Sequence, residues 1–145
     1  MFLVDTNVIS ERRKGRSADR GVMGFIQQAE NELFVPVQVV GELQGGIDRL
    51  RTRGDLPQAL RLEKWVRFIL EAYALRILSF DVHCAMLWGK LMGANDQHPV
   101  DKQIAAIALV YDLTIVTRNT ADFADTGVRL INPFLADAHP ASPTA

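Results

Sequence analysis

The sequence predicts a single α/β domain over residues 1–134, in which helices flank a mainly parallel central sheet. Three observations lead to this fold class. Short apolar runs recur along the chain, helical periodicity fills the segments between them, and 145 residues suit one domain with one sizeable core. In such a sheet, ligands gather beyond the carboxyl ends of the strands, so functional side chains are expected at that edge.

Five apolar runs predict strands, which in chain order cover residues 2–4, 33–37, 76–80, 114–117 and 128–131. Helical patterns cover residues 21–30, 39–53, 56–74, 82–94 and 100–111. The clearest helix is the one at 56–74, because Leu62, Val66, Ile69 and Tyr73 repeat at spacings of three and four. Residues 135–145 are mostly small or polar and contain two prolines, so we expect a flexible C-terminal tail.

The composition limits the class of protein and the kind of metal site. No apolar run approaches the ~20 residues that cross a bilayer, and Asp5 interrupts the apolar start, so we expect a cytoplasmic chain with no membrane partner. The one cysteine, Cys84, excludes an internal disulfide and a cysteine-rich zinc site. His83, His98 and His139 are scattered without metal-ligand spacing. Any bound metal is therefore expected to have oxygen ligands.

Basic residues concentrate in the first half of the chain, although the formal net charge is −1. One cluster follows the first predicted strand and consists of Arg12, Arg13, Lys14 and Arg16. Such runs are typical of solvated helix faces. Beside a catalytic site they would instead bind substrate phosphates, and both interpretations stay open.

Two acids come after predicted strands. Asp5 ends the first strand, and Asp122 follows the fourth by a few residues. Both positions fall at the edge of the sheet where ligands are expected. Each also has a structural explanation, because Asp5 can cap a helix that begins near Asn7 and Asp122 can stabilise a turn.

Two further acids lie on predicted helices. Glu42 borders the apolar stripe that contains Leu43, so its carboxylate reaches the edge of the core. Asp101 opens the helix at 100–111 and shares a face with Ile104 and Ala105. The structural alternatives are an amphipathic Glu42 with a solvated head group and an Asp101 that stabilises the helix N-terminus.

The four acids enter from four separate strand-to-helix regions, whose connections bring them to one edge of the sheet. Crowded carboxylates repel one another and resist burial, so a shared acidic pocket is stable only with a cation or with raised pKa values, and a divalent ion answers both problems. Mg²⁺ and Mn²⁺ favour carboxylate oxygens and can promote in-line displacement at phosphorus. The constellation therefore predicts metal-dependent cleavage of phosphodiesters.

The sequence resembles the PIN-domain family, and within it the VapC- and FitB-like toxins. The resemblance spans nearly all of residues 1–134. It is carried by four segments in order: VDTNVIS at 4–10, VGEL at 40–43 followed by Gly46, DKQIAA at 101–106, and TRN at 117–119 with Asp122 and Phe123. The order of four such segments is more specific than any one of them.

The resemblance implies a Mg²⁺- or Mn²⁺-dependent endoribonuclease that acts on RNA. It also implies a cognate antitoxin whose peptide enters the active-site groove, a homodimer, and a toxin–antitoxin hetero-oligomer. By motif, the central acids are Asp5, Glu42 and Asp101, and the fourth position is either Asn119 or Asp122. Thr6 and Thr117 correspond to supporting hydroxyls that act through metal-bound water. The basic cluster at 12–16 would then contact RNA or the antitoxin.

Other functions fit the sequence less well. A phosphoaspartyl phosphatase requires a second acid two residues after the first, where this chain has Asn7. A receiver-type signalling module requires a lysine near a later strand, and residues 117–119 match that requirement poorly. A noncatalytic PIN-like module that binds RNA or protein is the main rival, and the retained acids oppose it. Trp65, Trp88 and Tyr73 could stack on bases, but their helical settings favour core packing.

Overall fold

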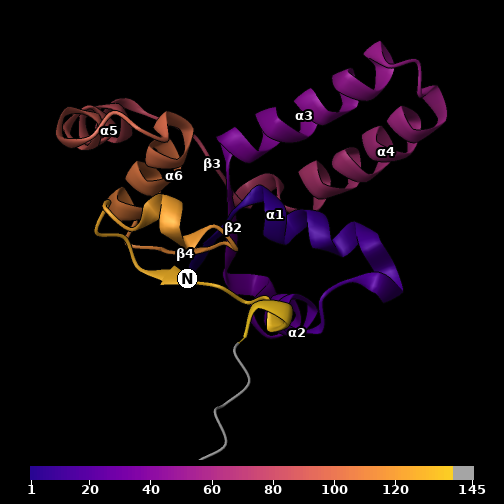
Figure 1. Cartoon of the computed structure of the whole chain (residues 1–145), viewed down its shortest axis with the longest axis horizontal. Helices are drawn as coiled ribbons and strands as arrows, with labels where there is room; N and C mark the ends of the chain where they lie inside the picture. Colours follow the sequence, from indigo (N-terminus) through magenta and orange to yellow (C-terminus); the bar gives the residue numbers. More distant parts are fainter. Residues whose placement is uncertain (139–145) are drawn as a thin grey trace, which may run out of the picture.

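The computed structural model describes residues 1–138, which form a five-stranded parallel sheet flanked by helices (Figure 1). The strand order is β3-β2-β1-β4-β5, and all four neighbouring pairs are parallel. The strands are β1 (Phe2–Val4), β2 (Leu33–Pro36), β3 (Ile77–Leu78), β4 (Thr114–Val116) and β5 (Leu130–Ile131). The predicted fold class is therefore confirmed.

The central strand β1 separates two apolar cores. Leu3 packs on one face of the sheet with residues of the last helix, whereas Val4 packs on the other face with residues of the earlier helices. Both side chains are almost fully buried. This alternation is expected for a strand covered on both faces, where successive side chains point to opposite sides.

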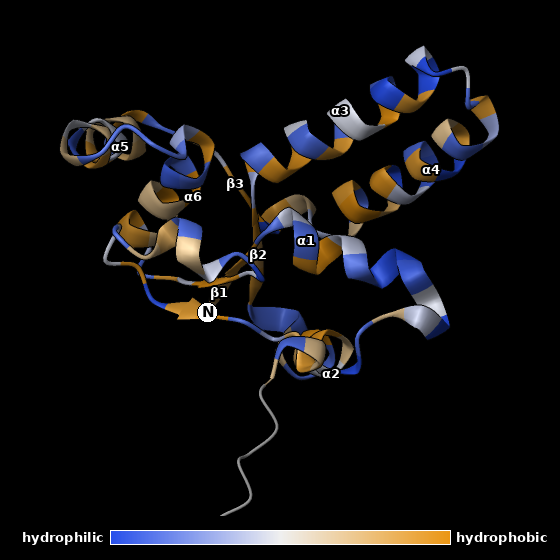
Figure 2. Ribbon diagram, viewed as in Figure 1, coloured by the Kyte–Doolittle hydropathy of each residue, from blue (hydrophilic) through white to orange (hydrophobic). Residues whose placement is uncertain are grey.

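Residues 1–138 contain six α-helices. The first follows β1 directly, and the other five lie close to the predicted helical segments. They are α1 (Thr6–Ile9), α2 (Arg20–Ala29), α3 (Val37–Thr52), α4 (Leu56–Ala72), α5 (Val82–Ala94) and α6 (Pro99–Val110). Helices α3 and α4 form a hairpin whose facing sides are apolar (Figure 2). Gly54 allows the sharp turn between them because its φ of 80° is in the left-handed region. None of the helices within residues 1–138 is both long and apolar enough to span a bilayer.

A 3₁₀ segment, Ser10–Ser17, follows α1 and was not expected from the sequence pattern. Its charged composition lacks apolar periodicity, and polar contacts of the buried Glu11 hold it instead. Glu11 is buried, accepts a hydrogen bond from the Asp19 backbone N–H at 2.8 Å, and pairs with Lys14 at 2.9 Å. These contacts fix the basic cluster to the start of α2.

The chain beyond β5 returns to α2. The Asp19 carboxylate caps α2 and also accepts hydrogen bonds from the backbone N–H groups of Leu135 (3.0 Å) and Ala136 (3.1 Å). Arg118 binds Asp137 through two hydrogen bonds of 2.8 and 2.9 Å. Part of the expected tail is thus docked, while its remainder, residues 139–145, lies outside the described residues.

Candidate active site

A cleft of about 310 Å³ opens at the carboxyl edge of the sheet. Its lining comes from the end of β1, from α3, from α6 and from the segment after β4, and consists of Asp5, Thr6, Asn7, Glu42, Asp101 and Asn119. The structure thus brings together three of the predicted acids. Asp122 does not line this cleft but lies close to Asp101, on the other side of His98.

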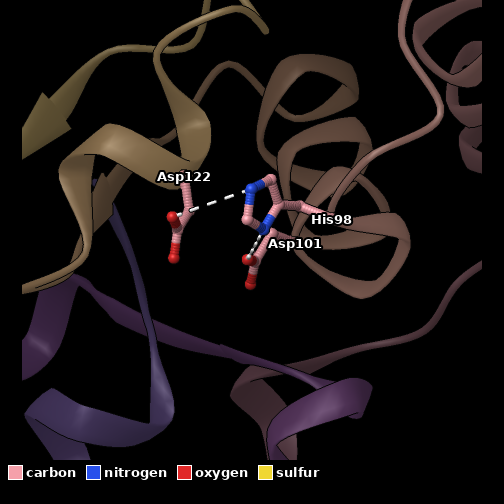
Figure 3. Close-up of side chains that lie close together, drawn as sticks. All are labelled: His98, Asp101 and Asp122. Carbon is pink, nitrogen blue, oxygen red and sulfur yellow. Dashed lines mark ion pairs between the residues drawn. The ribbon is translucent and has the colours of Figure 1, made fainter.

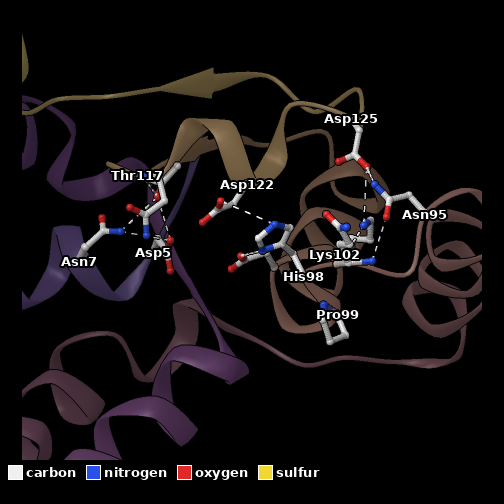
Figure 4. A network of polar contacts seen from close by, with 12 residues as sticks. Asp5, Asn7, Asn95, His98, Pro99, Lys102, Thr117, Asp122 and Asp125 are labelled. Carbon is white, nitrogen blue, oxygen red and sulfur yellow. Dashed lines mark hydrogen bonds and ion pairs between the residues drawn. The ribbon is translucent and has the colours of Figure 1, made fainter.

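Asp5 is the most buried of the four acids, with 6% of its surface exposed. One carboxylate oxygen caps α1 by accepting from the Thr6 N–H at 2.8 Å, and the other accepts from the Thr117 hydroxyl at 2.8 Å (Figure 4). Burial raises the pKa of Asp5, and these two hydrogen bonds oppose that rise. The capping role and the place in the cleft therefore coexist in one side chain.

Asn7 links the ends of the two central strands. Its amide nitrogen lies 3.4 Å from the Asp5 carboxylate and 3.3 Å from the Thr117 hydroxyl, while its amide oxygen accepts from the Arg118 N–H at 3.1 Å. The sequence pattern predicts no contact of this kind for Asn7. The available signal was its place two residues after Asp5, in the segment 4–10 that carries the family resemblance.

Glu42 projects from α3 at the border of the apolar stripe, as its position on the helix predicted. Its side chain is exposed while its neighbour Leu43 is buried. The Thr6 hydroxyl donates a hydrogen bond to Glu42 Oε2. Thr6 therefore contacts the carboxylate directly, whereas the resemblance implied support through metal-bound water.

Asp101 lies in the first turn of α6, and its pKa is raised to about 6. Burial is the largest cause, followed by the negative charges of Asp5 and Asp122, with Glu42 adding to them and His98 opposing. A carboxyl in this position is stabilised either by a proton or by a nearby cation. The oxygen-rich donor set fits a hard divalent ion such as Mg²⁺ or Mn²⁺.

One expectation about the histidines is wrong: His98 does not lie apart from the acids. Its Nδ1 is 3.8 Å from Asp101 Oδ2, and its Nε2 is 3.9 Å from Asp122 Oδ1 (Figure 3). His98 precedes α6 in the left-handed conformation (φ 53°), and Asp122 lies in the 3₁₀ turn Thr120–Phe123. Neither placement follows from sequence spacing, because it depends on the backbone of two separate loops.

The basic cluster lies away from the cleft. The Arg12 guanidinium donates to the Tyr73 hydroxyl at 2.8 Å, and Arg13 stacks over the Trp65 ring with its guanidinium carbon 5.5 Å from the centroid. Tyr73 is buried in the core, as expected. Lys14 pairs with Glu11, as described above, and Arg16 is exposed. The cluster therefore contributes to packing through Arg12 and presents charge to solvent through its remaining members.

The crowding at Asp101 gives a testable pH dependence. Because the folded-state pKa lies above the unfolded value, the contribution of Asp101 to stability is fully present below about pH 4 and is lost as the pH rises through about 6. In excess chelator, we expect Asp101→Asn to become more stable relative to the wild type as the pH rises. The difference between their free energies of unfolding should grow by up to about 3 kcal/mol from about pH 4 to neutral pH. Urea unfolding across the pH range measures the difference, and a constant difference would contradict the expected crowding.

Comparison with known proteins identifies the family of this chain. Residues 2–128 match the family model described as PIN domain. The chain is 36% identical to a plasmid stability protein, StbB, of Pseudomonas syringae pv. tomato, with 94% of this chain and 100% of that protein covered. It is 32% identical to a VapC ribonuclease, Y4jK, of Sinorhizobium fredii, with 92% and 98% covered.

Solved structures agree with these sequence matches. A crystal structure of FitAcB from Neisseria gonorrhoeae has a chain that superposes with a TM-score of 0.78 at 30% identity, over 92% of this chain and 98% of that one. A structure of FitAB bound to a DNA fragment superposes with a TM-score of 0.75 at 28% identity, over 97% and 100%. The similarity extends over nearly the whole of each chain.

Proposed function

Because the chain belongs to the PIN domain family, we propose that it is the ribonuclease toxin of a toxin–antitoxin pair and cuts RNA phosphodiester bonds with the help of Mg²⁺ or Mn²⁺. The observation that carries this proposal is the cleft in which Asp5, Glu42 and Asp101 meet from three different elements. Three carboxylates at one point are unfavourable for the fold alone, since each raises the energy of the others. Their juxtaposition is explained by a function that needs a cation.

Asp5, Glu42 and Asp101 would hold the metal ion, with Asn119 or Asp122 at the fourth position. When bound, such an ion supplies charge to stabilise a phosphoryl group and lowers the pKa of water. The remaining groups fix the acids in place. Thr117 and the Thr6 N–H hold Asp5, and the Thr6 hydroxyl holds Glu42, which limits the freedom of both carboxylates.

Asn119 gives the cleft a neutral polar wall. It lines the cleft next to the acids, and its backbone N–H donates to the Thr117 hydroxyl at 3.0 Å. An amide can donate a hydrogen bond to a phosphate oxygen, whereas a carboxylate would repel it. With Asp122 at the fourth position, Asn119 would bind substrate, so that the side of the cleft it forms accepts the anionic backbone of RNA.

The partners of the relatives point to the partners of this chain. Similar proteins bear the names toxin and ribonuclease, and the similar structures carry the paired names FitAcB and FitAB. We propose that this chain likewise binds a cognate antitoxin protein, as a homodimer within a hetero-oligomer. The exposed charges of Arg13, Lys14 and Arg16, with Arg12 beneath them, would contact the RNA or the antitoxin.

A circular single-stranded RNA tests the proposed reaction, because a circle has no ends and only an endonuclease can open it. We expect linear RNA and then fragments with Mg²⁺ or Mn²⁺, no cleavage in excess chelator, and no cleavage of a circular DNA of the same sequence. RNA binding without any cleavage would overturn the ribonuclease assignment. That outcome would support the noncatalytic binding module instead.

A further inference from the structure

Residues 132–137, here called the C-terminal segment, pack beside the loop that follows β4 (residues 117–119). After β5 the chain returns to α2, and Figure 1 shows its last turn next to that helix. The Arg118 guanidinium reaches this turn and donates to both carboxylate oxygens of Asp137, at 2.9 Å from Nε and 2.8 Å from Nη2. Its central carbon lies 4.6 Å from the centroid of the Phe134 ring. Arg118 therefore joins the loop to the C-terminal segment.

The pair of Arg118 and Asp137 differs from an ordinary surface ion pair, which contributes little because solvent screens it and both side chains are mobile. Its fork geometry fixes the guanidinium at two points. Phe134 is 5% exposed, so the ring beneath the guanidinium is held by the core. The Asn132 amide donates to the same carboxylate at 3.2 Å. Both partners are therefore held in one orientation.

The backbone of Arg118 belongs to a second network, which reaches the cleft. Its N–H donates to Asn7 Oδ1 at 3.1 Å, and the Asn7 amide nitrogen lies 3.3 Å from the Thr117 hydroxyl (Figure 4). That hydroxyl donates to the Asp5 carboxylate at 2.8 Å and accepts from the Asn119 N–H at 3.0 Å. Thr117 is fully buried, and its hydroxyl uses its one donor and both lone pairs. A shift of the loop would therefore break buried hydrogen bonds that position Asp5.

The side chain of Arg118 is directed to the C-terminal segment rather than into the cleft. Its neighbour Asn119 lines the cleft, whereas Arg118 is not part of the lining. The Asp137 oxygens already occupy the edge of the guanidinium with which arginine binds a phosphate. These contacts favour a role in holding the loop over direct binding of RNA.

We propose that Arg118 and Asp137 are positioning residues, through which the C-terminal segment fixes the loop after β4 and the orientation of Asp5. Neither side chain lines the cleft, so each acts through the hydrogen bonds of Asn7 and Thr117. The expected effect on cleavage rests on the proposed function. The hold on the loop rests on the contacts alone.

Amide hydrogen exchange followed by NMR tests the hold on the loop without reference to activity. The N–H groups of Arg118 and Asn119 are bound by side chains in the wild type. We expect Asp137→Asn and Arg118→Lys, which remove the charged fork, to speed exchange at both groups at least about tenfold. The amide of the buried Val66 in α4 should keep its wild-type rate, which shows in the same spectra that the variants are folded.

The matched control is the ion pair of Arg129 and Asp112, whose charged atoms lie 3.0 Å apart at the opposite end of β4. Arg129→Lys and Asp112→Asn make the same chemical changes and should leave exchange at Arg118 and Asn119 as in the wild type. An unchanged exchange rate in both test variants, or an equal increase in the control variants, would overturn the positioning role.

RNA cleavage separates positioning from phosphate binding. At saturating Mg²⁺, we expect Asp137→Asn and Arg118→Lys each to lower kcat about tenfold, with KM for circular RNA within about twofold of the wild type. The double variant should be no slower than the slower single variant, because both changes remove the same link. Asp137→Glu keeps the carboxylate and should retain most of the wild-type kcat.

The opposite kinetic pattern would overturn the proposal. A raised KM in Arg118→Lys, together with normal cleavage by Asp137→Asn, would assign Arg118 to RNA phosphates instead. Failure of the wild type to cleave circular RNA would remove the proposed function. The exchange rates would still decide whether the C-terminal segment holds the loop.

Discussion

Replacing Asp101 with asparagine will reduce RNA cleavage by about a thousandfold or more while leaving the fold intact. The substitution keeps the size of the side chain but removes the charge that a hard cation needs. Loss of such an electrostatic contribution costs roughly 4 kcal/mol in the transition state, and each 1.4 kcal/mol is a factor of about ten in rate. The measurement is cleavage of circular RNA at saturating Mg²⁺, with circular dichroism to establish that the variant is folded.

The matched control is Asp112→Asn. Asp112 lies in the turn before β4 with its side chain 86% exposed and with a left-handed φ of 54°, a conformation that asparagine also adopts readily. Its cleavage rate should equal that of the wild type. Near-normal cleavage by a folded Asp101→Asn would mean that Asp101 only stabilises the start of α6, because asparagine serves that purpose about as well.

Among glycine-to-alanine substitutions, Gly21→Ala is expected to cause the largest loss of stability. A Cβ at Gly21 would lie 2.3 Å from the carbonyl oxygen of Pro133 and 2.8 Å from the backbone nitrogen of Leu135. Both are backbone atoms, so α2 and the docked C-terminal segment must move apart. We expect the free energy of unfolding to fall by about 2–4 kcal/mol, through lost Asp19 hydrogen bonds and exposure of Phe134.

Gly24→Ala on the same helix separates this contact from helix propensity. No atom outside its immediate neighbourhood lies within 4 Å of a Cβ at Gly24, so alanine should be neutral or stabilise the protein by up to about 1 kcal/mol. Urea unfolding of both variants gives the comparison. Equal stability of the two variants would refute the close approach at Gly21.

Most of the fold follows from local pattern. The apolar runs place all five strands, and the helix at 82–94 coincides with α5. The observed strands β3 and β5 are shorter than the runs that predicted them, because only Ile77–Leu78 and Leu130–Ile131 find partners in the ladder. An apolar pattern predicts which residues are buried, whereas the ends of a strand depend on its pairing with a distant segment.

The site divides in the same way. Asp5, Glu42 and Asp101 could be predicted, because each sits at a fixed place relative to a strand or an apolar stripe. The contacts of His98 and the burial of Lys102 could not. Both depend on the contact between the segment around the start of α6 and the turn after β4. No periodicity within either segment predicts that contact.

The central position of β1 in the sheet also determines when the cleft can form while the chain is being made. Thr117, which holds Asp5, lies 112 residues after it in the chain, and β4 must pair with β1 to bring the two together. Domains made on the ribosome complete their long-range pairings only after the later strands emerge. A growing chain that stops short of β4 therefore carries its first acid without the partner that positions it. A complete cleft therefore forms only after β4 and the segment that carries Asn119 have been translated.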